Sequence, residues 1–243
     1  MALEALIAGV LAAAPLVIGA LLALRLQISN RTLGALLAFG AGTLIYAVSF
    51  ELAGEALEYR ESVVLAAGLA AGALAFYYGD RALTSWSGTR KPHRGHAEPD
   101  GAGPALVLGG LLDGVPEQAA LGISIASGSG VSVALIAAII ISNLPESFGA
   151  SAELRRAGWK GSTIVGSWSA VAVLAMLATV GGALLLDEAS GAVRSGVLGF
   201  AAGAVLLTLS DSLIPEAREK GGPVTGLMTA LGFAVALGLS LLD

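Results

Sequence analysis

The sequence predicts an all-α membrane protein with eight transmembrane helices. Of the 243 residues, 56% are hydrophobic and only 13% are charged, and the mean hydropathy is +0.82. Because a water-soluble domain usually has about a quarter of its residues charged, this composition indicates that lipid covers most of the surface. Apolar runs of roughly 20 residues, the length with which a helix crosses the hydrocarbon core, recur along the chain. We expect spans at 2–24, 32–56, 62–80, 104–127, 131–154, 161–186, 193–217 and 222–242.

The composition also excludes several classes of chemistry and partner. The chain has no cysteine, which leaves no disulfide and no thiolate metal site. Its net charge of −5 provides no basic stripe for phosphates, so we expect membrane lipid and not nucleic acid as a partner. Neither a phosphate-binding loop nor a His-Glu-x-x-His metalloprotease motif occurs. We therefore expect neither an enzyme nor an organic cofactor.

The basic residues predict the orientation of the spans, because short loops rich in lysine and arginine stay in the cytoplasm. If the N-terminus lies outside, every lysine and arginine except Arg60 and Arg194 falls in a cytoplasmic loop. The first run, 2–24, lacks a basic leader and is too long for the apolar core of a signal peptide, so we expect it to remain as a span. The prediction is a multi-pass protein of the cell (inner) membrane with both termini outside.

One long polar stretch divides the chain. Its proline, glycine and charge content is typical of a disordered cytoplasmic linker. His93 and His96 lie in this linker, where two interpretations stay open: a weak metal site that serves a transporter, or two histidines in a solvated basic loop. The expected segments are helices 1 to 3 at 1–80, the linker at 81–103, the central helices 4 and 5 at 104–155, and helices 6 to 8 at 156–243.

An internal repeat relates the second and seventh spans. At an offset of 161 residues, the segment 37–42 matches 198–203, and the segment 52–58 matches 213–219. The expected topology runs these two spans in opposite directions, which makes helices 1–3 and 6–8 inverted repeats around central helices 4 and 5. Inverted repeats around a site in the membrane midplane are typical of alternating-access transporters. The alternative is a chance similarity between helices rich in alanine and glycine.

Each central helix carries a Pro-Glu pair near its middle, Pro116-Glu117 in helix 4 and Pro145-Glu146 in helix 5. Ionisable groups at this depth cost about 2.5 to 3.5 kcal/mol each to insert, so their presence is informative. Several oxygen ligands around a divalent cation compensate one another, whereas neutral glutamates that merely bridge two kinked helices are the alternative. The neighbouring polar residues share the same helix faces at spacings of three and four. The candidate metal ligands are Asp113, Glu117, Ser142, Asn143 and Glu146.

Further acidic residues lie nearer the ends of helices 2 and 7. Glu51 and Glu55 lie toward the outer end of helix 2, and Asp211 and Glu216 lie toward the inner end of helix 7. They would relay a cation to and from the midplane, although interfacial solvation explains Glu55 and Glu216 equally well. The candidate residues of the transport pathway are Glu51, Glu55, Gln118, Asp211 and Glu216.

These features together resemble the ZIP family of Zrt-, Irt-like divalent-metal transporters over nearly the whole chain. The resemblance rests on the paired Pro-Glu motifs, the histidine-containing loop before helix 4, the eight spans and a Leu-Ile-Pro-Glu-Ala element at 213–217. In that family, helices 4 and 5 each carry a His-Asn-x-Pro-Glu-Gly-like motif that binds the metal. Here Asp113 and Ser142 replace the two histidines, Gly114 replaces the first asparagine, and Gln118 and Ser147 replace the glycines.

The resemblance implies a divalent-metal transporter that works by alternating access, with Zn²⁺, Fe²⁺ or Mn²⁺ as its substrate. The loss of both histidines leaves oxygen ligands, which favour harder cations such as Mn²⁺ over Zn²⁺. We expect one metal ion per protomer, and a homodimer is compatible with the sequence. The alternatives are a cation channel, a non-transporting metal-binding homologue, and a proton-coupled carrier of another solute.

Overall fold

The computed structural model describes residues 1–86, 102–127 and 131–242, and every regular element in them is a helix. Seven helices in this part of the chain are long and apolar enough to cross a membrane. The prediction of an all-α, multi-pass membrane protein is therefore confirmed. His93 and His96 lie outside the described residues.

The predicted spans coincide closely with the helices. The first six match one helix each, and the last two, 193–217 and 222–242, both fall within the apolar segment Gly191–Leu242. The chain reverses within that segment near Gly222, whose φ of 68° is readily adopted only by glycine. In chain order, the α-helices are α1 Ala2–Arg25, α2 Asn30–Tyr46, α3 Ala53–Glu58, α4 Ser62–Trp86, α5 Ala102–Ala126, α6 Val133–Arg156, α7 Gly161–Leu185, α8 Gly191–Thr208, α9 Ile214–Gly221 and α10 Thr225–Leu239.

Two π-helical turns interrupt otherwise straight helices. The turn η1, Ala47–Leu52, joins α2 to α3, and the turn η2, Leu209–Leu213, joins α8 to α9. Short 3₁₀ turns, Gly222–Val224 and Ser240–Leu242, precede and follow α10. π-turns inside α-helices occur frequently at functional sites, because the extra residue frees a carbonyl and re-aims the side chains.

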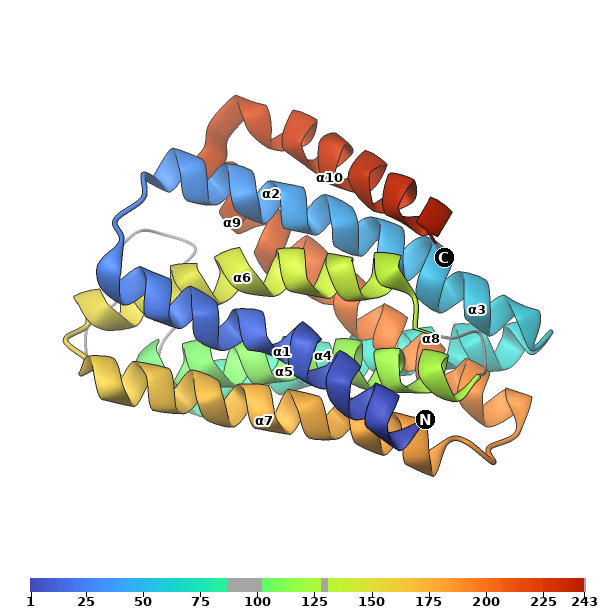
Figure 1. Cartoon of the computed structure of the whole chain (residues 1–243). Coiled ribbons are helices and arrows are strands. Elements are labelled where there is room, and N and C mark those ends of the chain that lie inside the picture. The colour runs from blue at the N-terminus through green and yellow to red at the C-terminus, as the bar shows by residue number, and fades with distance from the viewer. Residues whose placement is uncertain (87–101, 128–130, 243) are drawn as a thin grey trace.

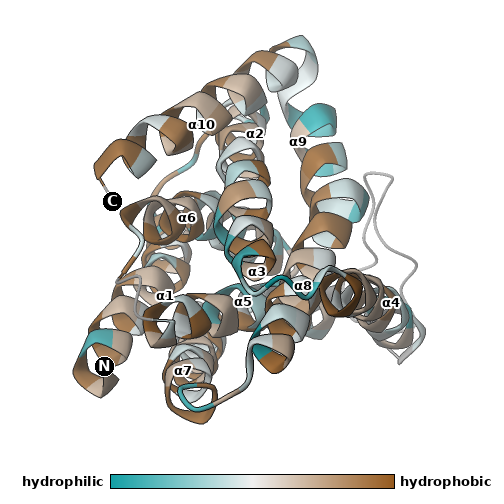
Figure 2. Ribbon diagram, turned by 90° about the vertical axis from the view of Figure 1, so that its right-hand side faces the viewer, coloured by the Kyte–Doolittle hydropathy of each residue, from teal (hydrophilic) through white to brown (hydrophobic). Residues whose placement is uncertain are grey.

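The helices pack as two neighbouring groups that run along the bundle (Figure 1). In one group, α1 and α7 pack on the central helices α6 and α5 and on each other. In the other group, α10 packs along α2 and α4 packs along α8. Figure 2, which looks along the bundle, shows both pairs side by side, with α5 close to α7 and with α9 next to α2.

Glycine lets the helices of the second group approach one another closely. A Cβ atom added to Gly42 in α2 would lie 2.0 Å from the carbonyl oxygen of Thr229 in α10. A Cβ atom added to Gly203 in α8 would likewise lie 2.0 Å from the carbonyl oxygen of Leu69 in α4. Such backbone contact is the usual means of packing helices in lipid, where no hydrophobic force drives them together.

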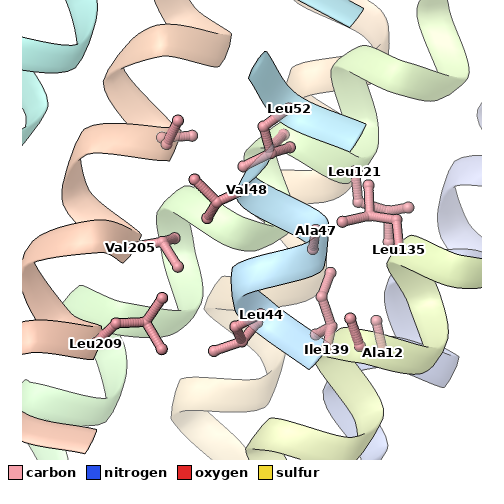
Figure 3. Packing of buried hydrophobic residues seen from close by; sticks show 14 of the residues in the cluster. Ala12, Leu44, Ala47, Val48, Leu52, Leu121, Leu135, Ile139, Val205 and Leu209 are labelled. Atoms are coloured by element: carbon pink, nitrogen blue, oxygen red, sulfur yellow. The ribbon is translucent and has the colours of Figure 1, made fainter. Parts of the chain in front are cut away.

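The interface between the two groups is apolar around the first π-turn. Figure 3 shows Val48 and Leu44 facing Val205 and Leu209 of α8 and η2 on one side. Ala47 lies toward the central helices, on the side where α5 and α6 contribute buried leucine and isoleucine side chains. The π-turn η1 therefore lies where the two helix groups meet.

Candidate functional site

The two central helices bring three acidic side chains together. Asp113 and Glu117 lie one turn apart on α5, and Glu146 lies on α6, each beside an internal proline. Asp113 and Glu146 share a side-chain hydrogen bond, and Glu117 is close enough to both to interact with them electrostatically. The side chain of Glu117 is buried, with the residue only 7% exposed. The acids that were predicted to meet between helices 4 and 5 are thus neighbours in the structure.

A hydroxyl group from the second helix group completes this cluster. The Oγ1 atom of Thr208, at the end of α8, donates a hydrogen bond to Oδ1 of Asp113 at 2.8 Å and also contacts the carbonyl of Ala204 at 3.2 Å. Sequence reasoning missed Thr208, although its place near the middle of an apolar span was an available signal. The hydroxyl links the central helices to the residue that immediately precedes η2.

The two polar residues before Pro145 make other contacts. The amide of Asn143 donates to the carbonyl of Ala12 in α1 at 3.2 Å, and the hydroxyl of Ser142 donates to Ile139 of its own helix at 3.1 Å. Ser147, one turn after Asn143, donates to the carbonyl of Pro15 at 3.3 Å. These hydrogen bonds attach α6 to α1.

Gln118 belongs to the interface between α5 and α7. Its Oε1 atom accepts a hydrogen bond from the hydroxyl of Thr179, and the residue is fully buried. Its Nε2 atom is buried and has no hydrogen-bond partner among the described residues. Gln118 therefore holds α5 against α7, while its chain neighbour Glu117 faces the other acids.

The outer acids lie around the first π-turn. Glu51 is in η1, and Glu55 follows in α3, where its side chain forms hydrogen bonds with Ser124 and Ser127 near the end of α5. Atom Oε1 of Glu55 is buried without a partner in the described part of the chain. Sequence reasoning had not singled out the two serines.

The inner acids lie beyond the second π-turn. Asp211 is exposed in η2, whereas Glu216 in α9 is partly buried and interacts electrostatically with Glu146. The ammonium of Lys220 lies 2.6 Å from Glu216 and 3.0 Å from Glu153 of α6. Neither Lys220 nor Glu153 was among the predicted residues.

The arrangement of the midplane acids limits the chemistry that they support. Two carboxyl groups can share a hydrogen bond when one of them carries a proton, and a cation can take the place of that proton. Within the described residues, no group of three or more histidine, cysteine, aspartate and glutamate side chains is placed to hold a metal ion together. The site thus combines a hydrogen-bonded acid pair, Asp113 and Glu146, with a third acid nearby.

No protein-family model matches this chain, and no curated protein matches it. The resemblance to ZIP transporters therefore rests on the sequence motifs quoted above, and the function is argued below from those motifs and from the geometry of the site.

Proposed function

We propose that this protein is a divalent-cation transporter whose cation binds between α5 and α6 at Asp113, Glu117 and Glu146. The observation that carries the proposal is the meeting of three acids, two of them hydrogen-bonded to each other, inside a bundle of apolar helices. Intramembrane acids of this kind generally mark an ion or proton pathway. A divalent cation would compensate charges that lipid and apolar side chains do not.

The ligand chemistry favours a hard or borderline cation. Carboxylate and hydroxyl oxygens suit Mn²⁺ and, to a lesser degree, Fe²⁺, whereas Zn²⁺ is usually held together with histidine or cysteine. The hydrogen-bonded pair Asp113 and Glu146 adds a second consequence, because a cation that enters between them displaces the shared proton. Cation binding is therefore coupled to proton release in this proposal.

We further propose eight spans in which helices 1–3 and 6–8 are inverted repeats, with the termini outside. Matching local features at the offset of 161 support this topology. Ser29 and Ser190 each cap a helix by accepting from the amide three residues later. Ser49 and Ser210 each donate to the carbonyl four residues earlier, inside η1 and η2.

The glycine contacts between helices repeat in the same way. Gly42 and Gly203, which are 161 residues apart, both touch a partner carbonyl with the same spacing. A second pair of contacts joins Gly72 to Phe200 and Gly232 to Phe39, where the two phenylalanines are again 161 residues apart. Two sets of contacts that exchange under one relation are unexpected for a chance similarity of small-residue helices.

Alternating access would follow from relative movement of the two helix groups. Hydrogen bonds and glycine contacts attach the helices within each group, as in the bonds from Asn143 and Ser147 to α1. Apolar side chains around η1 and η2 form much of the interface between the groups. Glu55 with Ser124 at one end, and Glu216 with Glu153 at the other, would then receive and release the cation.

Uptake into vesicles tests the proposal. Purified protein in liposomes should accumulate Mn²⁺ with saturable kinetics, and Glu117→Gln or Glu146→Gln should reduce uptake by at least about tenfold, because a lost ligand should cost no less than a lost neighbour of a ligand. Glu188→Gln, at an exposed turn, is the matched control. Unchanged uptake in both site variants would reject the site, and ohmic single-channel currents would favour a pore over a carrier.

A further inference from the structure

Lys220 joins two carboxylates that belong to different helix groups. It pairs with Glu216 one turn earlier in α9 and with Glu153 in α6. The Lys220 side chain is only 16% exposed, so water screens the pair with Glu153 less than it would screen a surface ion pair. The bridge therefore crosses from the α2–α9–α10 side of the molecule to the central helices.

The bridge also lies next to the midplane acids. Glu216 interacts electrostatically with Glu146, so an ammonium on Glu216 stands at the inner end of a continuous acidic path. A cation that leaves Glu146 toward that end meets carboxylates already occupied by a positive charge. The lysine and a departing cation thus compete for the same oxygens.

The opposite end of the bundle has different chemistry at the matching positions. The offset of 161 that places Glu55 on Glu216 places Tyr59 on Lys220, and the two Pro-Glu pairs, 29 residues apart, place Ser124 on Glu153. Glu55 forms its hydrogen bond with the hydroxyl of Ser124. A neutral contact therefore stands where the inner end has an ion bridge.

We propose that Lys220 is a tethered cation that locks α9 to α6 and holds the inner mouth closed until the helix groups separate. This rests on the proposed transport function for its meaning, although the lock itself does not require transport. When the lock opens, Glu216 and Glu153 lose their shared counter-charge and attract the cation from the midplane. Closure restores the ammonium and expels the cation from the inner mouth.

The lock is tested by a distance measurement in the absence of metal. The chain has no cysteine, so cysteines introduced at the exposed positions Arg156 in α6 and Glu219 in α9 carry the only spin labels. The parent protein and Lys220→Arg should give one short distance distribution. Lys220→Met should raise the population at longer distance by about fivefold, which is near the upper limit for a partly exposed ion pair.

Two further variants keep the test decisive if Lys220→Met fails to fold. Glu153→Gln removes only the contact between the groups and should also lengthen the distance, whereas the exchange Lys220→Glu with Glu153→Lys should restore the short one. An unchanged distribution in Glu153→Gln or Lys220→Met would overturn the lock. Because this measurement needs neither metal nor flux, its outcome is independent of whether the vesicle assay detects transport.

Discussion

Alanine at the closest glycine contacts should destabilise the protein, although alanine normally favours a helix. A Cβ atom at Gly42 or Gly203 would lie 2.0 Å from a partner backbone oxygen, well short of the 3.4 Å at which ordinary contact begins. The partner helix must therefore move, at the typical overpacking cost of about 1 to 3 kcal/mol. In contrast, Gly226 has no atom within 4 Å of such a Cβ, so Gly226→Ala should gain up to about 1 kcal/mol from helix propensity.

Thermal unfolding in detergent, followed by circular dichroism, measures the difference. For a chain of this size, each kcal/mol shifts the melting temperature by roughly 2 to 4 °C. Gly42→Ala and Gly203→Ala should therefore melt several degrees below the parent, and by similar amounts if the two contacts are symmetry mates. Equal melting temperatures for Gly42→Ala and Gly226→Ala would refute the packing, and a large drop in only one of Gly42→Ala and Gly203→Ala would refute the equivalence.

Two hydroxyl groups give the remaining predictions. Thr208→Val should weaken Mn²⁺ binding by about tenfold in calorimetric titration, since a hydrogen bond to a charged group contributes roughly 1.5 to 3 kcal/mol; the exposed Thr163→Val is its control, and equal affinities would contradict a role for Thr208. Thr179→Val should lower the free energy of unfolding by about 1 to 3 kcal/mol, because it leaves the buried amide of Gln118 without its partner. Adding Gln118→Leu should recover much of that stability, and no change in melting temperature for Thr179→Val would count against the clamp.

The helices were predictable because lipid constrains them so strongly. A backbone that crosses the hydrocarbon core must satisfy its hydrogen bonds internally, so an apolar run of about 20 residues has few other conformations. The two π-turns were not predictable in the same way. Segments 47–52 and 209–213 contain neither proline nor glycine, and an extra residue in a helical turn is selected by packing against neighbours. Their signal was the serine that each repeat carries at the same position, Ser49 and Ser210.

The site was predictable where spacing along one helix decides the outcome. Asp113 and Glu117 are four residues apart, so they share a face of α5 whatever that face contacts. Spacing does not tell which neighbouring helix a face meets. Asn143 and Ser142 adjoin the same proline as Glu146, yet their hydrogen bonds go to α1 and to their own helix. Lys220 and Glu153 come together across 67 residues, a relation that no local pattern contains.

Near-equal helix frames with unequal ends carry a consequence for the direction of closure. If the repeats are inverted copies, the matched glycine contacts and π-turns provide similar backbone packing to an outward-open and an inward-open arrangement. The preference between the two must then come from side chains that differ at matching positions. Lys220 differs from Tyr59, and Glu153 differs from Ser124, so an ion bridge stabilises closure at the inner end where a neutral hydrogen bond serves at the outer end. The proposed resting state is therefore closed toward the cytoplasm, and a cation arriving from outside reaches the midplane acids before the inner lock opens.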